Sequence, residues 1–126
     1  MPSPDRKDPP LVVKARTHRR TALIELYGEL DIATVPAVAK VLDEVKPHAD
    51  GVRHIVMDLR GLTFMDVSAL RELIRQNEAA RVNRHNLAVV RGGSLTDRLL
   101  RLTEVDAQLV LVDDPDDLVP PAADAA

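Results

Sequence analysis

The sequence contains no cysteine and no tryptophan, and its 126 residues include one tyrosine and one phenylalanine. Without cysteine the chain has no disulfide, no thiolate nucleophile and no cysteine-containing zinc site, so a redox role is excluded. Aromatic residues make up only 2% of the chain, which leaves base-stacking platforms for single-stranded nucleic acid and aromatic cages poorly supported. We therefore expect an aliphatic core.

Charge of one sign and long hydrophobic runs are also missing. Seventeen Lys and Arg residues oppose twenty Asp and Glu residues, which gives a net charge of −3 and no overall field that would attract nucleic acid or an anionic membrane. No apolar run approaches the ~20 residues that cross a bilayer, and the N-terminus carries no stretch that resembles a signal peptide. We expect a cytoplasmic protein without a nucleic-acid partner and without direct membrane insertion.

The length is that of one domain. Four of the nine prolines fall within residues 1–10, among charged residues, and predict a flexible leader there. Residues 119–126 are rich in alanine and proline and predict a flexible tail. The folded domain is therefore expected over residues 11–118.

The first half of this domain begins with two strand-like patterns. Partly alternating apolar runs at residues 11–16 and 21–27, separated by a basic turn, predict a hairpin. Apolar residues from Val35 to Val45 recur at helical spacing after Thr34, a plausible N-cap. The mostly apolar run at residues 54–59 predicts a central strand, followed by a loop at residues 60–64.

The second half alternates helix and strand. Asp66 is a preferred N-cap, and it precedes a helical stripe that runs from Leu70 to Ala80. Residues 87–90 and 109–112 are strand candidates. Between them, residues 94–97 have the spacing of a capping box, which opens a helix with the stripe Leu95, Leu99 and Leu102. The order β-β-α-β-α-β-α-β predicts a single α/β domain with a mixed, mostly parallel sheet and three to four helices.

Motifs of enzymes are missing from this framework. The four histidines are scattered without metal-ligand spacing, and the chain has no P-loop, no GxSxG turn and no GxGxxG loop. Asp58, at the end of a strand, imitates the phosphate-accepting aspartate of a response-regulator receiver. A receiver also needs acidic residues after its first strand and a late basic residue, but residues 14–16 read Lys-Ala-Arg and the last lysine is Lys46. We predict no enzymatic activity, no cofactor and no metal.

The remaining polar constellation lies at two strand-to-helix junctions. Glu29 and Asp31 follow the second strand, and Asp66 and Ser68 open the second helix. On an α/β sheet these junctions would converge on one edge. A phosphate on Ser68 would be favoured by the helix N-terminus and repelled by Asp66, which is the conflict that a charge switch needs. The plain alternative is structural, since Asp and Ser are common at helix starts.

At these places the sequence resembles the STAS domain family, specifically the stand-alone anti-sigma factor antagonists of bacteria. The resemblance rests on Tyr27–Asp31, on Val56–Leu59 with Leu62–Asp66, and on Leu99–Asp106. It implies partner switching in regulation of transcription: the antagonist binds an anti-sigma factor that is also a serine kinase, the sigma factor is released, and phosphorylation of the antagonist reverses the exchange. The protein would then be a ligand and substrate of the kinase.

One position departs from the family pattern. The second helix of such antagonists usually starts Asp-Ser-Ser-Gly-Leu or Asp-Ser-Thr-Gly-Leu, and the serine directly after the aspartate takes the phosphate. Here Val67 stands at that position and has no hydroxyl, and Ala69 replaces the glycine. Either Ser68 has become a displaced phosphorylation site or phosphoregulation is lost. A shift of one residue rotates a helical side chain by about 100°, which favours loss.

The resemblance and the converging junctions together give a candidate partner-binding surface. It comprises Glu29, Asp31, Asp66, Val67, Ser68, Ala69 and Leu70. The carboxylates would meet basic residues of the anti-sigma factor, and Val67, Ala69 and Leu70 would supply apolar contact. The alternative function is that of a scaffold or accessory subunit in a signalling or transport complex. A homodimer is compatible with either function.

Overall fold

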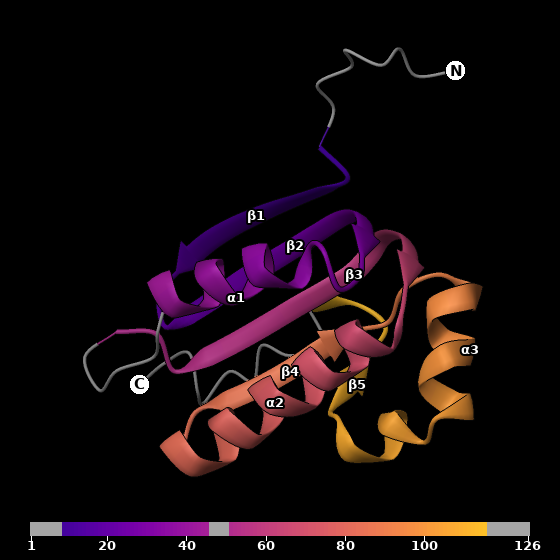
Figure 1. The fold of residues 1–126 in the computed structure, drawn as a ribbon. Helices are drawn as coiled ribbons and strands as arrows, with labels where there is room; N and C mark the ends of the chain where they lie inside the picture. Colours follow the sequence, from indigo (N-terminus) through magenta and orange to yellow (C-terminus); the bar gives the residue numbers. More distant parts are fainter. Residues whose placement is uncertain (1–8, 46–50, 116–126) are drawn as a thin grey trace.

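Five strands form one sheet in the order β1-β2-β3-β4-β5, in which β1 runs antiparallel to β2 and all other neighbours are parallel. This computed structural model describes residues 9–45 and 51–115 (Figure 1). The elements are β1 (Leu11–His18), β2 (Thr21–Leu30), α1 (Val35–Glu44), β3 (His54–Met65), α2 (Val67–Asn83), β4 (Asn86–Val90), α3 (Ser94–Leu102), the 3-10 helix η1 (Val105–Gln108) and β5 (Leu111–Val112). The predicted fold class and order of elements are confirmed.

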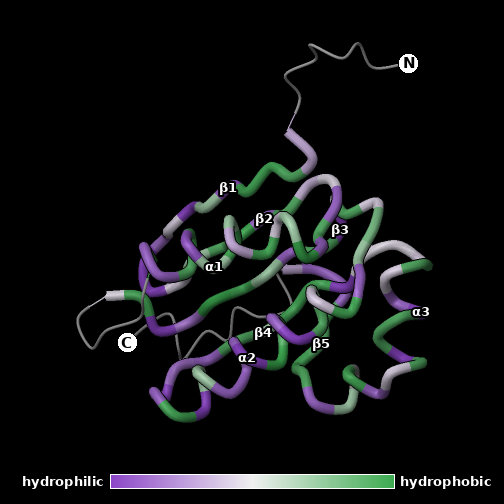
Figure 2. Tube along the Cα trace, viewed as in Figure 1, coloured by the Kyte–Doolittle hydropathy of each residue, from purple (hydrophilic) through white to green (hydrophobic). Residues whose placement is uncertain are grey.

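An aliphatic core lies between the sheet and the helices, and α1 and α2 lie on the same side of the sheet (Figure 1). Alternate residues of the central strands point to this side, among them Ile24 of β2 and Met57 of β3, both fully buried. Val38 of α1 and Leu73 of α2 pack against them. Figure 2 shows the hydrophobic residues in green along β3 and β4. The expected aliphatic core is thus confirmed.

The intervening residues of these strands point to the other side of the sheet. Lys14, Glu25 and Asp58 are register partners across β1, β2 and β3, so their side chains share this face. Tyr27, two residues after Glu25 on β2, lies on the same face, and the Lys14 Nζ is 5.4 Å from the centroid of its ring. The face is polar mainly over β1 and β2: burial alternates along β2, whereas β3 and β4 are buried at successive positions.

Strand β3 is longer than the sequence pattern predicts. Residues 60–64, predicted as a loop, continue the strand to Met65. They pair with the second half of β2, which itself extends to Leu30, through two register shifts next to Glu25 and Gly28. The charged and glycine residues at Arg60 and Gly61 broke the apolar pattern, but a β-bulge accommodates them within the ladder.

Helix α3 is turned relative to the prediction. Its N-cap is Gly93, not Ser94, and no side chain caps it. The buried positions are Thr96 and Leu100, whereas Leu95 and Leu102 are 73% and 70% exposed. The Thr96 hydroxyl donates to the Gly93 carbonyl oxygen at 2.9 Å, which holds this polar side chain inward. Leu99 packs partly against the core, so the hydrophobic spacing misplaced Leu95 and Leu102 and missed Thr96.

Strand β5 covers only Leu111–Val112, two residues shorter than the strand predicted over residues 109–112, and η1 ends before it at Gln108. Most of the predicted leader and all of the predicted tail lie outside the described residues. None of the described helices is both long enough and apolar enough to cross a membrane.

Candidate functional site

The two strand-to-helix junctions lie side by side at one edge of the sheet. Glu29 pairs with Phe64 and Leu30 with Met65 in the parallel ladder. The Asp66 N–H donates to the Leu30 carbonyl oxygen at 3.2 Å, which links the last residue of one strand to the residue that begins α2. We call this surface the junction edge and define it by Glu29, Asp31, Ile32, Phe64, Asp66, Val67 and Ser68.

The turn from β2 into α1 is fixed by Asp31 and Thr34. One oxygen of the Asp31 carboxylate accepts from the Ala33 N–H at 3.0 Å and from the Thr34 N–H at 3.2 Å. Thr34 occupies the predicted N-cap position, but its hydroxyl makes no capping bond to the helix. It donates instead to the Glu29 carbonyl oxygen at 2.8 Å. Asp31 therefore has a structural role in addition to its predicted contact with a partner.

The residues just before β1 also hold the junction edge, through contacts with the end of β2. Gly28 has φ +110°, and a Cβ there would lie 2.2 Å from the Pro10 carbonyl oxygen. The Glu29 N–H donates to this oxygen at 2.8 Å. Only glycine adopts such a φ without strain and leaves room for the close approach of two backbones. The backbone of Glu29 is thus held from both flanking strands.

The start of α2 follows the predicted cap. Asp66 is extended, with φ −117° and ψ −173°, and its carboxylate accepts from the Ala69 N–H at 3.2 Å. Val67 is 53% exposed, whereas Ser68 is half-buried. Ala69 and Leu70 are 0% and 3% exposed, so the prediction that they supply apolar contact to a partner is wrong. The helical period turns both of them onto the sheet, where they join the core.

Two exposed apolar residues of the junction edge were missed as partner contacts. Ile32 is 76% exposed in the turn after β2, and Phe64 is 49% exposed near the end of β3. Once β3 is known to reach Met65, strand alternation accounts for Phe64, because its neighbour Met65 is buried. Protein-binding surfaces commonly have an apolar centre and a polar rim.

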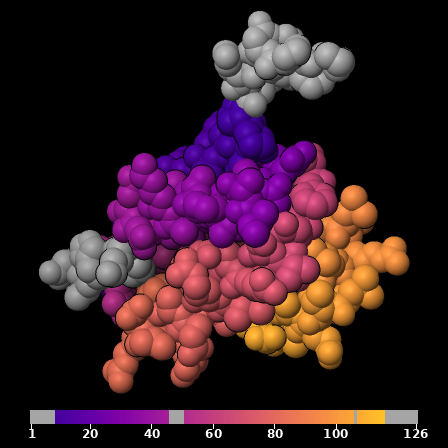
Figure 3. Space-filling model, viewed as in Figure 1, coloured from indigo at the N-terminus to yellow at the C-terminus, as the bar shows by residue number. Residues whose placement is uncertain are grey.

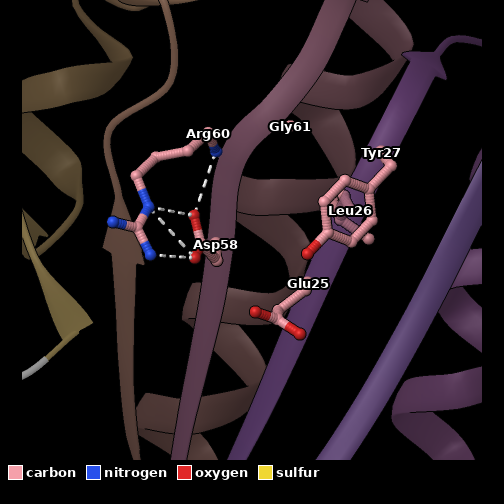
Figure 4. Close-up of a pocket in the computed structure, with 6 residues that line it drawn as sticks. All are labelled: Glu25, Leu26, Tyr27, Asp58, Arg60 and Gly61. Atoms are coloured by element: carbon pink, nitrogen blue, oxygen red, sulfur yellow. Dashed lines mark hydrogen bonds and ion pairs between the residues drawn. The ribbon is translucent and has the colours of Figure 1, made fainter.

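A separate cavity of about 340 Å³ opens around Asp58, Arg60 and Tyr27, on the face of the sheet opposite α1 and α2 (Figure 4). The Arg60 guanidinium donates to both Asp58 oxygens, at 2.8 to 3.2 Å, and the Arg60 N–H donates at 3.0 Å. Burial alone would raise the pKa of the Asp58 carboxyl, but the bonds from Arg60 outweigh it and hold that pKa below its ordinary value. Asp58 is thus an ion-paired structural carboxylate.

Metal binding finds no support in the described part of the chain, where no cluster of three or more His, Asp or Glu side chains is positioned to hold an ion. Glu25 lies beside Asp58 in the ladder and lines the same cavity, but Glu25 pairs with Arg16 at 3.6 Å and Asp58 pairs with Arg60 at 2.8 Å, so each carboxylate is already neutralised by an arginine. Among the described residues, the junction edge is therefore the better candidate for a functional site, as a surface that contacts a partner.

Comparison with known proteins supports the family resemblance predicted from the sequence. The sequence model of a family described as "Mlab, STAS domain" matches residues 13–113. The anti-sigma-B factor antagonist of Staphylococcus aureus is 28% identical over 95 residues, which are 75% of this chain and 83% of that protein.

Solved structures agree with this match. An anti-sigma factor antagonist from Mycobacterium paratuberculosis is 25% identical, with a TM-score of 0.71 and full coverage of both chains. The unphosphorylated form of the anti-sigma factor antagonist SpoIIAA shares the fold at 16% identity, with a TM-score of 0.70 over 89% of this chain and 96% of that one. The predicted resemblance is therefore confirmed: the chain belongs to the STAS domain family.

Proposed function

We propose that this protein is an anti-sigma factor antagonist that acts by binding, not by catalysis. It captures an anti-sigma factor with serine-kinase activity, and the sigma factor is released in the cytoplasm. The observation that carries the proposal is the junction edge itself, where two turns are joined by the bond from Asp66 to Leu30 and present carboxylates beside exposed apolar side chains. The names of the relatives from Staphylococcus aureus and Mycobacterium paratuberculosis support it.

The composition of the junction edge suits a partner with a basic and apolar surface. Glu29 is exposed, and the carboxylate of Asp66 keeps acceptor capacity beyond its single capping bond. Ile32, Phe64 and Val67 add apolar area that a partner would bury. The turns are held by backbone bonds before a partner arrives, so little conformational entropy is lost on binding.

Phosphoregulation at the usual position is absent in this proposal. Val67 is the more exposed residue of the first turn of α2 and carries no hydroxyl, whereas the hydroxyl of Ser68 is on a half-buried side chain. A protein kinase can phosphorylate a side-chain hydroxyl only if that hydroxyl is accessible to its active site. Binding is therefore constitutive, and Ser68 acts as an ordinary helix-start residue.

Affinity capture from the native lysate, with and without ATP, tests both parts. Mass spectrometry of the retained proteins is expected to identify a kinase-fold anti-sigma factor, and ATP is expected to leave it bound. Absence of any such protein would refute the antagonist function. Release by ATP together with a stoichiometric phosphate on Ser68 would show that the phosphorylation site is displaced and that regulation is retained.

The alternative function is that of a scaffold or accessory subunit in a signalling or transport complex. Sedimentation of the captured complex separates the two functions. A small complex with one anti-sigma factor fits the antagonist, whereas a large membrane-associated particle fits the accessory subunit.

A further inference from the structure

The edge of β4 is only partly covered by β5. The Val89 N–H donates to the Val110 carbonyl oxygen at 2.8 Å, and the Arg91 N–H donates to that of Val112 at 2.9 Å. Because the N–H and C=O groups of successive strand residues point to opposite edges, those of Leu87 point to the same edge as those of Val89. The ladder with β5 begins only at Val89. The backbone N–H and C=O of Leu87 therefore have no partner at this edge among the described residues.

Asn77 explains why the ladder stops there. Two residues further back, the ladder would pair the Leu87 N–H with the Gln108 carbonyl oxygen. That oxygen accepts instead from the side-chain amide of Asn77, at 2.8 Å. Gln108 also ends the 3-10 helix η1, so the chain before it is not a strand. The open donor and acceptor of Leu87 thus follow from the way α2 and η1 are joined.

A cavity of about 560 Å³ lies at this open edge, between α2, β4 and the segment that starts at Gln108. Figure 3 shows the yellow surface of η1 next to the pink-to-orange surface of α2. Ala80, Leu87 and Ala88 are buried residues of its lining, and Asn77 and Gln108 add polar groups. Sites for small organic molecules combine this size with apolar walls and a few polar groups.

The titratable side chains of the cavity favour a neutral ligand. Arg81 is already ion-paired with Glu78. Burial lowers the pKa of the His85 imidazole below its ordinary value, so this ring is uncharged at pH 7, and its buried Nδ1 has no hydrogen-bond partner in the described part of the chain. The Nδ1 of His54 lies 2.8 Å from the Asn86 amide nitrogen. No carboxylate is among the described residues that line the cavity, so a cationic ligand would find no counter-charge.

A peptide strand fits this edge less well than a small molecule. Val89 is occupied by Val110, and the His85 N–H donates to the Ala80 carbonyl oxygen at 3.1 Å. Within the described part of β4, only Leu87 is open at this edge. Addition of a strand to a sheet uses a row of such groups. A single donor beside a single acceptor matches a compact molecule that carries one acceptor and one donor side by side.

We propose that this cavity binds a small, neutral, planar molecule that contains a cyclic amide. In a ring the amide C=O and N–H lie on the same side, so the C=O accepts from the Leu87 N–H while the N–H donates to the Leu87 carbonyl oxygen. The flat ring packs against the apolar walls. The cavity lies at the starts of β3 and β4, whereas the junction edge lies at the ends of β2 and β3. The inference therefore does not depend on the proposed function.

The test uses carbostyril, a bicyclic aromatic lactam, and its N-methyl derivative, in which a methyl group replaces the N–H. Each compound is titrated into the full-length, isotope-labelled protein and followed by NMR. Carbostyril is expected to cause saturable shifts of the Leu87 and Val110 amides. The methylated compound is expected to bind about tenfold more weakly, because it leaves the Leu87 carbonyl oxygen without a donor.

Three substitutions locate the site. Val110 lines the cavity and is 56% exposed, so Val110→Trp fills space there without disturbing the core and should abolish binding. Val110→Thr keeps the size of the side chain and should retain binding. Val82→Trp places the same ring on α2 outside the cavity, at a position that is 64% exposed, and should also retain binding. Thermal unfolding of each variant verifies that it is folded.

Several results would overturn the inference. They are the absence of saturable shifts at Leu87, equal binding of the two compounds, and retained binding in Val110→Trp. An equal loss of binding in Val82→Trp would place the compound elsewhere on the protein. Saturable binding of an extended tetra-alanine peptide at Leu87, without binding of carbostyril, would assign the open edge to a peptide main chain.

Discussion

Asp66 has two roles that a pair of substitutions can separate. Its carboxylate caps α2 through the bond to the Ala69 N–H, and its charge lies on the junction edge. Asp66→Ser retains an oxygen that can accept the capping bond and removes the charge. Asp66→Lys removes the cap and reverses the charge. The first substitution therefore isolates the electrostatic contribution to binding.

The expected magnitudes differ between stability and binding. Loss of the cap costs about 1 kcal/mol of unfolding free energy, and a lysine at the helix N-terminus costs roughly 0.3–1 kcal/mol more. For a chain of 126 residues this lowers Tm by roughly 4–8 °C. Asp66→Ser should change the unfolding free energy by less than about 0.5 kcal/mol. Loss of a hydrogen bond to a charged group weakens partner binding by about 1.5–3 kcal/mol, on the order of tenfold to a hundredfold.

Circular dichroism during thermal unfolding measures the first effect, and isothermal calorimetry with the purified anti-sigma factor measures the second. We expect Asp66→Ser to lose affinity while it keeps its Tm, and Asp66→Lys to lose both. Unchanged affinity in both variants would remove Asp66 from the interface. Equal losses of Tm in both variants would contradict the capping role of the side chain.

Three further predictions concern other parts of the molecule. The folded pKa of Asp58 lies below its unfolded value of about 3.9, so its ion pair with Arg60 stabilises the fold fully above that pH and this contribution is lost as the pH falls through the folded pKa; in Asp58→Asn, urea midpoints should lack this acid dependence. Gly28→Ala should destabilise the fold by more than about 2 kcal/mol in urea unfolding, because φ is +110° and backbone blocks its Cβ, whereas Gly93→Ala, with open space, should cost less than about 1 kcal/mol. Val67→Ser places a hydroxyl at an exposed position and should be phosphorylated by the partner kinase, as intact-mass spectrometry would detect; no added phosphate would contradict the assignment of this position.

The prediction of the elements succeeded where local patterns and tertiary packing agree. The hairpin, the first two helices and β4 have a clear hydrophobic period, and Asp66 marks the start of the second helix. It failed at residues 60–64, because the pairing of β3 depends on the length of β2 and on a bulge that no residue of β3 alone specifies. The boundary of a strand is thus a property of two segments.

The candidate site was predicted in part. The convergence of Glu29, Asp31 and Asp66 followed from topology, since parallel strands end at one edge of a sheet. The exposure of each side chain did not follow. Val67 is outward while Ala69 and Leu70 are buried, and this depends on how α2 is rotated about its axis against the sheet.

The sequence by itself determined the aliphatic core, the order of the elements, the family motifs and the absence of a hydroxyl at Val67, because composition, hydrophobic period and side-chain chemistry are local properties. Tertiary structure alone decided which side of α3 is buried. Leu95 and Leu102 are exposed, whereas Thr96 is buried with Leu100 and Leu99 packs partly against the core. The hydrophobic period predicts that a helix has an apolar and a polar side, but the packing of its neighbours selects the side that is covered.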